Sequence, residues 1–320
     1  MAKKLSKVNV SSMRRYIYSG LFVATLILLY FVRTKEFERS AFYMDTLWEV
    51  KIVSHVYPKR AFNRVFTVIA HIDSLANVFG DGELAKINSG HRMKVSSELK
   101  EMLEVGIKMG KLSGGAFDVT IYPLMKCWHF FRDQYVPTDS EILAALQRVD
   151  YRKIEFRHDT LVLPEGYGID LGGLAKGYAV ESAIKVLKDM GVRRALVNGG
   201  GEIGVIGSWK IGIRHPRQQD GIIDTFTLVD AYVATSGDYE RYFVKDGKYY
   251  HHILDPRTGL PAMELVSVTV VDTSGVWADA IATAVFVLGE DKGKKLLQQL
   301  GITRYWIYTR EEFQTSEAPK

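Results

Sequence analysis

The chain has 320 residues, of which 47% are hydrophobic and 25% are charged, the balance of a globular protein with one large domain or two smaller ones. This composition excludes a disordered chain, a collagen and a coiled coil, and the single cysteine, Cys127, excludes an internal disulfide framework and a zinc site made of several cysteines. Five of the 42 basic residues precede position 16, which leaves 37 basic and 37 acidic residues in the rest of the chain. The body of the protein is therefore neutral, and no nucleic-acid partner is expected.

An uncharged apolar segment of 17 residues, 16–32, follows these five basic residues. Its length is near the shortest that spans a bilayer core, and the positive charge before it places the N-terminus in the cytoplasm. We predict that residues 1–40 form a basic cytoplasmic stub and a transmembrane helix at about 16–32. Residues 41–320 would then form a domain on the extracytoplasmic (periplasmic) side of the cytoplasmic membrane. Two alternatives remain: a signal peptide, although no small-residue cleavage site follows the apolar run, and a buried helix of the domain.

From residue 41 onward, alternating and helical hydrophobic patterns are mixed. Alternation predicts strands at residues 48–52, 209–211 and 266–270, and helical spacing predicts helices at residues 60–79, 96–111, 140–148, 174–190 and 276–288. Gly191 stands where the fourth of these helices would stop. The Gly- and Pro-rich stretches are too short for domain linkers. The expected fold is a single α+β domain with mixed or antiparallel sheets and packed helices, preceded by one transmembrane helix.

A glycine-rich loop at residues 112–120 brings an aromatic ring, Phe117, next to a carboxylate, Asp118. Such a loop could hold the ring of a ligand and one of its sugar hydroxyls. A turn that buries a core phenylalanine explains the same residues.

Residues 169–177 run from the end of a strand through Gly172 and Gly173 into the helix expected at 174–190. Free backbone N–H groups at a helix start suit phosphate. Lys176 adds a positive charge there although it opposes the helix dipole, which favours an anionic ligand. A tight turn with a solvated lysine is the alternative, and the dinucleotide fingerprint GxGxxG is absent.

Two histidines, His251 and His252, precede the turn Asp-Pro-Arg-Thr-Gly. A histidine at a strand end beside a turn is well placed as a general base. A hairpin whose histidine is solvated explains the pattern as well.

The helix expected at residues 276–288 is apolar on nearly all sides, with oxygen-bearing side chains only at Asp279 and Thr283. Such a helix is buried, and a buried carboxylate must be paired or bind a metal. Asp279 and Thr283 are four residues apart and point the same way. Their hard oxygens suit Mg²⁺ or Ca²⁺ better than zinc. The alternative is an Asp that pairs with a core arginine or caps a neighbouring helix.

Taken together, these segments resemble the FAD:protein FMN transferase family, the ApbE-like flavin transferases. The resemblance runs from about residue 41 to about residue 310 and rests on seven motifs in the family's order: a Met-x-Thr strand at Met44–Thr46, Gly-Ala-Phe-Asp at Gly115–Asp118, Asp-Leu-Gly-Gly-Leu-Ala-Lys-Gly at Asp170–Gly177, Asn-Gly-Gly-Gly-Glu at Asn198–Glu202, Thr-Ser-Gly-Asp-Tyr-Glu-Arg at Thr235–Arg241, His-Ile-Leu-Asp-Pro-Arg-Thr-Gly at His252–Gly259 and Ala-Asp-Ala-Ile-Ala-Thr-Ala at Ala278–Ala284.

The resemblance implies an enzyme outside the cytoplasmic membrane that transfers FMN from FAD to a Ser or Thr hydroxyl of another protein and releases AMP. It implies Mg²⁺ as cofactor, with Ca²⁺ or Mn²⁺ as alternatives, held by Asp279, Thr283 and the Gly173 carbonyl. His252, which directly precedes Ile-Leu-Asp-Pro, takes the catalytic position. The implied FAD contacts are Met44, Phe79, Ala116, Phe117, Asp118, Asp170, Lys176 and Ile253.

The family's usual acceptors imply that the partner is a flavoprotein subunit of a membrane redox complex. Two other functions use the same pocket: an FAD pyrophosphatase that yields FMN and AMP, and a flavin-binding protein without turnover.

The sequence departs from the family pattern at several positions. Asp45 replaces the glycine of Met-Gly-Thr, Phe79 stands where a tyrosine is frequent, and Val119 replaces a proline. These changes affect the expected flavin contacts and leave the metal pair, the lysine and the histidine in place.

Overall fold

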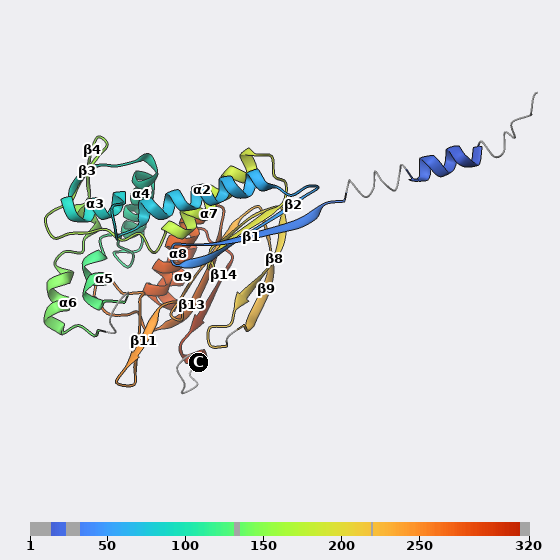
Figure 1. Cartoon of the computed structure of the whole chain (residues 1–320). Coiled ribbons are helices and arrows are strands. Elements are labelled where there is room, and N and C mark those ends of the chain that lie inside the picture. The colour runs from blue at the N-terminus through green and yellow to red at the C-terminus, as the bar shows by residue number, and fades with distance from the viewer. Residues whose placement is uncertain (1–13, 24–32, 131–134, 219, 314–320) are drawn as a thin grey trace, which may run out of the picture.

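The computed structural model describes residues 14–23, 33–130, 135–218 and 220–313 (Figure 1). Residues 14–23 are helical and their side chains are exposed. Within the described ranges, no helix is both long and apolar enough to cross a membrane. Residues 24–32 of the predicted transmembrane segment lie outside the described residues, so the anchor stays a prediction.

A seven-stranded antiparallel sheet forms the centre of the domain (Figure 1). The strands lie in the order β1 (Lys35–Tyr43), β2 (Thr46–Ser54), β6 (Ala195–Gly199), β7 (Ile203–Ile206), β10 (Tyr232–Gly237), β13 (Leu265–Asp272) and β14 (Tyr305–Thr309). Successive side chains of a strand point to opposite faces. On β6, Val197 therefore belongs to one apolar core and Leu196 to another, which means that both faces of the sheet are covered.

Helices cover one face of this sheet. They are α2 (Lys59–Ala76), α7 (Ala175–Asp189), α8 (Gly275–Leu288) and α9 (Glu290–Gln299). α7 packs on β6 and β7, α8 packs on β10 and β13, and α2 and α9 pack on α7 and α8 respectively. Val65, Ile69 and Ile72 of α2 are buried at helical spacing because one stripe of an amphipathic helix faces the core. α7 and α8 thus lie side by side against the centre of the sheet.

A hairpin of β8 (Ser208–Arg214) and β9 (Ile222–Val229) covers the opposite face. Trp209, Ile211 and Ile213 are buried there and alternate with exposed residues along β8, which confirms the strand predicted at this position.

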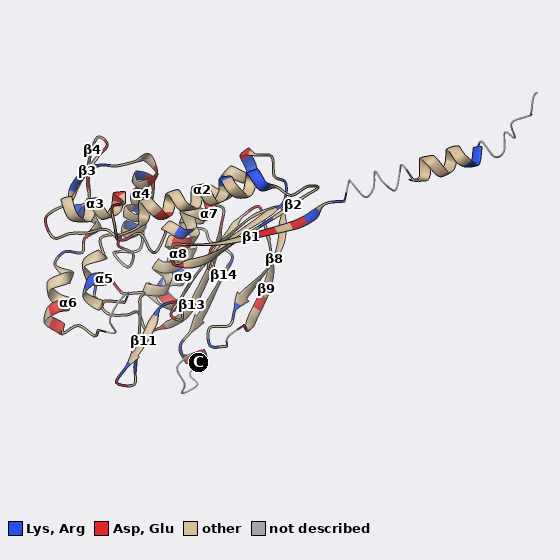
Figure 2. Ribbon diagram, in the orientation of Figure 1, with Lys and Arg blue, Asp and Glu red and all other residues tan. Residues whose placement is uncertain are grey.

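The remaining elements form smaller units around the helical face. The helices are α3 (Glu83–Gly90), α4 (Ser97–Leu112), α5 (Tyr122–Trp128) and α6 (Asp139–Leu146), with 3₁₀ turns η1 (Tyr151–Lys153) and η2 (Glu311–Phe313). The strands are β3 (Arg92–Lys94), β4 (Glu155–Arg157) and β5 (Thr160–Val162) in one sheet and β11 (Tyr242–Lys245) with β12 (Lys248–His251) in another. Both signs of charge are scattered over the ribbon of the described domain (Figure 2).

The α+β class with antiparallel sheets is confirmed, as are the predicted helices and strands of the domain, with ends shifted by a few residues. α2 ends three residues early because Asn77 is extended and its Oδ1 accepts a hydrogen bond from Phe79 N at 2.8 Å. α7 ends at Asp189, just before the predicted stop at Gly191, whose φ of +76° is in the left-handed region that favours glycine.

The strand expected at Met44–Thr46 is wrong in its first two residues. Met44 and Asp45 form the two-residue turn between β1 and β2, with φ values of +48° and +59°. Positive φ at both central residues is the mark of a type I′ turn, whose backbone matches the right-handed twist of the flanking strands. The conformation explains why glycine suits position 45, and aspartate is one of the other residues that tolerate it.

Candidate functional site

One cavity of about 640 Å³ opens where the β1–β2 turn, the end of α2, the start of α7 and the middle of α8 meet the ends of β10 and β12. This volume is typical of a site for a cofactor-sized molecule. The twelve residues that sequence reasoning singled out all line it: Met44, Phe79, Ala116, Phe117, Asp118, Asp170, Gly173, Lys176, His252, Ile253, Asp279 and Thr283. Their common location is observed, and their individual roles stay predictions.

The predicted metal ligands come together on α8 and the loop before α7. Asp279 is only 4% exposed, and its Oδ2 accepts a hydrogen bond from Gly177 N at 2.9 Å. Thr283 lies one turn further along α8, with its hydroxyl 3.1 Å from the hydroxyl of Ser236. Gly173 is adjacent: a Cβ at this position would lie 3.3 Å from Thr283 Oγ1. Asp279, Thr283 and Gly173 therefore line the same part of the cavity.

This donor set fits a hard divalent cation. All its atoms are oxygens, the ligands that Mg²⁺ and Ca²⁺ prefer. In the described part of the chain, Asp279 forms no ion pair with an arginine. Those residues also contain no cluster of three or more His, Cys, Asp or Glu side chains that would offer a metal a different site. The charged residues that line the cavity are mostly acidic, with two cationic residues, Lys176 and Arg241, against seven acidic ones: Asp45, Asp73, Asp118, Asp170, Glu202, Glu240 and Asp279. An anionic ligand would need an added cation to offset this charge.

Lys176 lines the cavity, as the anion-binding interpretation predicts, and its side chain is 26% exposed. Its Nζ lies 2.6 Å from Oε2 of Glu202, a carboxylate whose side chain is 3% exposed. Burial disfavours the ammonium ion, but Glu202 and Asp279 outweigh this and hold the pKa of Lys176 above its usual value. Glu202 was missed as a site residue, although it closes the motif at Asn198–Glu202 and a buried carboxylate requires a partner.

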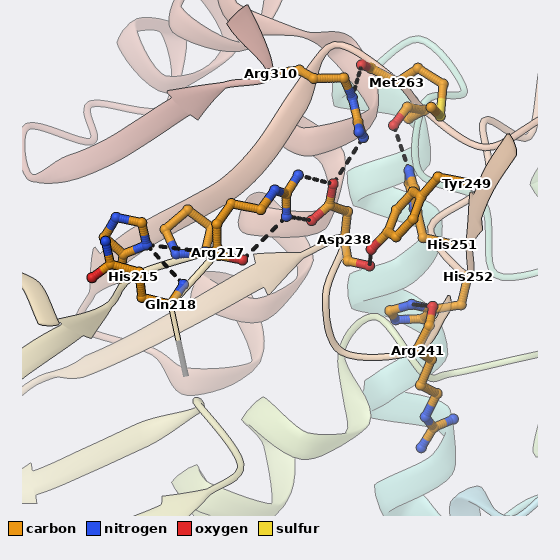
Figure 3. A network of polar contacts seen from close by, with 12 residues as sticks. His215, Arg217, Gln218, Asp238, Arg241, Tyr249, His251, His252, Met263 and Arg310 are labelled. Atoms are coloured by element: carbon orange, nitrogen blue, oxygen red, sulfur yellow. Dashed lines mark hydrogen bonds and ion pairs between the residues drawn. The ribbon is translucent and has the colours of Figure 1, made fainter. Parts of the chain in front are cut away.

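The two adjacent histidines differ in their hydrogen bonds (Figure 3). His251 is fully buried, its Nε2 bonds the Ala262 carbonyl at 2.8 Å, and its Nδ1 accepts from Ile253 N at 3.3 Å. Both ring nitrogens of His251 are thus occupied by backbone. His252 lines the cavity, and its Nδ1 lies 3.1 Å from the Arg241 carbonyl.

A carbonyl can only accept, so Nδ1 of His252 carries the proton and Nε2 presents a lone pair. Burial, with His251 and Arg241, lowers the pKa of His252 to about 3. The imidazole is therefore neutral near neutral pH and able to accept a proton at Nε2.

The glycine-rich loop after α4 builds another wall of the cavity. Phe117 is 5% exposed and belongs to the main core as well as to the cavity. Asp118 directs its oxygens inward: Oδ1 accepts from the backbone N–H and the hydroxyl of Thr120, and Oδ2 accepts from Tyr151 N at 2.9 Å. Asp118 thereby holds the shape of the loop. Phe79, by contrast, is 48% exposed at the cavity.

Replacing Gly177 by alanine should disturb both stability and metal binding. A Cβ here would collide with the Gly275 carbonyl and lie 2.7 Å from Asp279 Cβ, so α8 would have to move away from α7. We expect a loss of about 1–3 kcal/mol in the free energy of unfolding and weaker Mg²⁺ binding in a titration. Gly90→Ala is the matched control, since a Cβ there meets nothing within 4 Å. Equal Mg²⁺ affinity in both variants would contradict the assigned ligand geometry.

Because the pKa of His252 is low, we predict that kcat/KM does not fall on the acid side of its pH profile. A base that must be neutral stays neutral at every pH well above its pKa, and for His252 that pKa is about 3. We expect kcat/KM to stay nearly constant from pH 8 to pH 5, whereas a histidine with the usual pKa of about 6.5 would lose about 30-fold of its neutral form over that range. An inflection near pH 6.5 in the wild-type profile, absent from a variant of His252, would refute this expectation.

Comparison with known proteins gives a consistent result. The model of the ApbE family matches residues 44–306. The FAD:protein FMN transferase of Klebsiella pneumoniae is 33% identical over 270 residues, which cover 81% of this chain and 85% of that protein. The protein of the same name from Vibrio cholerae is 36% identical, over 69% of this chain and 71% of its own. The crystal structure of the ApbE protein from Thermotoga maritima superposes with a TM-score of 0.81 at 31% identity, covering 87% of this chain and 95% of that one.

Proposed function

The chain belongs to the ApbE family, and from this membership we propose that it is an FAD:protein FMN transferase that moves FMN from FAD to a Ser or Thr hydroxyl of another protein and releases AMP. The observation that carries the proposal is that His252, with Nδ1 bonded to a carbonyl, lines the same cavity as Asp279, Thr283 and Gly173, which would offer a metal only oxygen ligands. An alcohol needs a base to attack phosphorus, and a pyrophosphate needs positive charge around it.

Each of the cavity residues named below has a separate role in this reaction. His252 Nε2 accepts the proton of the acceptor hydroxyl while the hydroxyl oxygen forms a bond to the phosphorus atom of the FMN half. The bond from that phosphorus to the bridging oxygen breaks, and AMP leaves with this oxygen. Mg²⁺ held by Asp279, Thr283 and the Gly173 carbonyl would neutralise charge on the pyrophosphate oxygens. Lys176, kept charged by Glu202, adds attraction for the same anion.

The test follows the mass of an acceptor together with AMP release. The full chain is incubated with FAD, Mg²⁺ and a flavoprotein domain that carries an exposed Ser or Thr, and the same domain with that residue changed to Ala serves as control. An acceptor heavier by one FMN unit, with matching AMP, supports the transferase. Release of FMN and AMP from FAD, without a mass change in any of several acceptors, would instead identify a pyrophosphatase, in which water replaces the hydroxyl.

We further propose that the segment 16–32 anchors the protein in the cytoplasmic membrane with the cavity on the outer side. The basic residues before the segment and its uncharged run support this orientation, and the acceptor would then be a flavoprotein subunit of a membrane redox complex. The full chain should sediment with membranes and be degraded by protease added outside intact spheroplasts. A chain that lacks residues 2–32 should be soluble, and a full chain found in the soluble fraction would contradict the proposal.

A further inference from the structure

A buried ion-pair network lies beside the cavity and takes no part in the reaction described above (Figure 3). Its centre is Asp238, which directly follows β10 and is fully buried. Arg217 contacts both carboxylate oxygens at 2.7 and 2.8 Å, and Arg310 donates to Oδ2 at 2.8 Å. Arg310 also donates from Nε to the Met263 carbonyl at 2.8 Å. The network thus joins the loop after β8, the loop after β10 and the end of β14.

This network is connected to His252 through a short loop. Asp238 begins the segment that leads to β11, and three residues later the Arg241 carbonyl accepts hydrogen bonds from both N and Nδ1 of His252, each at 3.1 Å. A second link comes from β12, because the Tyr249 hydroxyl donates to the Asp238 carbonyl at 2.5 Å. The loop that carries the Arg241 carbonyl and the strand that directly precedes His252 are therefore both tied to Asp238.

We propose that Asp238, clamped by Arg217 and Arg310 and tied to β12 by Tyr249, is a positioning residue that holds the Arg241 carbonyl against His252 Nδ1 and so keeps Nε2 as the proton-accepting nitrogen. This inference rests on the role of His252 in the proposed function. A ring that lost its carbonyl partner could carry its proton on Nε2 instead, and that tautomer offers no lone pair to the cavity.

Charge burial by itself does not explain the network. The cost of removing a carboxylate and two guanidinium groups from water offsets most of their attraction, so such a cluster adds little net stability. What it does add is geometric restraint, because Asp238 uses both side-chain oxygens and its carbonyl to join three parts of the chain. Small displacements of a catalytic group lower rates strongly.

The test compares Tyr249→Phe with Tyr250→Phe in the full chain. Tyr249→Phe removes only the hydroxyl that donates to Asp238, whereas Tyr250 lies on the other face of the hairpin, packed on Phe243 and Trp128. Asp238→Asn is the stronger variant, and Tyr249→Phe keeps the test decisive if Asp238→Asn does not fold. The readouts are the ¹⁵N shifts of the His252 ring, assigned with His252→Gln, and kcat and KM for FAD.

We expect Tyr249→Phe to increase the fraction of His252 protonated on Nε2 and to lower kcat about five- to tenfold, the effect of one lost hydrogen bond, with KM unchanged. Tyr250→Phe should match the wild type in both. Unchanged ring shifts and kcat in a folded Tyr249→Phe variant would overturn the inference. The ring shifts do not depend on transfer, so a failure of His252 as base would appear separately, as transfer retained by His252→Gln.

Discussion

Replacement of His252 by alanine should lower the rate of FMN transfer by about 10²–10⁴-fold, the usual contribution of a general base, and should leave FAD bound. The neutral ring presents Nε2 to the cavity because Nδ1 is bonded to the Arg241 carbonyl. No other histidine in the described residues lines this cavity. The measurement pairs acceptor mass against time with FAD affinity from flavin fluorescence.

His252→Gln provides the matched control for this result. Glutamine keeps a polar group of similar length and is not a base, so transfer should remain low while FAD binding is preserved. A rate near that of the wild type in His252→Ala would mean that another group accepts the proton. A loss of FAD binding in both variants would mean that His252 holds the ligand, and its assignment as the base would then be wrong.

Replacement of Asp279 by alanine should abolish metal-dependent turnover, with a loss on the order of 10³-fold, because a metal supplies several kcal/mol of charge stabilisation to a phosphoryl transfer. Asp279 is the carboxylate of the donor set, and α8 buries it beside Thr283. Without it, the hydroxyl and the carbonyl carry no formal charge to attract a divalent cation. Rates measured across a Mg²⁺ titration test this, with the melting temperature as a check on folding.

Two further variants separate a metal role from general damage. Thr283→Val keeps the shape of its side chain and removes one oxygen, so it should shift the Mg²⁺ dependence to higher concentration with a smaller loss of rate. Asp291→Asn removes one charge from the exposed start of α9 and should leave the titration unchanged. An Asp279→Ala enzyme with the Mg²⁺ dependence of the wild type would remove the metal assignment.

Helices and strands were predictable where their pattern depends on residues a few positions apart. The stripe of α7 and its stop near Gly191 are properties of neighbouring positions, and the structure has both. β13 forms where alternation predicts a strand, but residues 265–270 are all buried, so the half-buried strand that alternation implies is wrong there. Met44 and Asp45 were misassigned because their positive φ values depend on the pairing of β1 with β2. β1 itself is an edge strand with many charged residues, which weakens its alternation.

The sequence by itself determined a set of candidate residues that the structure brings to one place. Glycine runs, an apolar helix with one carboxylate and a histidine before a turn are visible without a fold, and all twelve chosen residues line one cavity. Only the tertiary structure decided their ion pairs, hydrogen-bond partners and tautomers. Lys176 meets Glu202 across 26 positions and Gly177 meets Asp279 across 102, and the carbonyl that sets the tautomer of His252 is on the far side of a hairpin. The physical reason is that pKa, tautomer and ligand geometry depend on hydrogen bonds and burial between distant segments, which residue patterns along the chain do not encode.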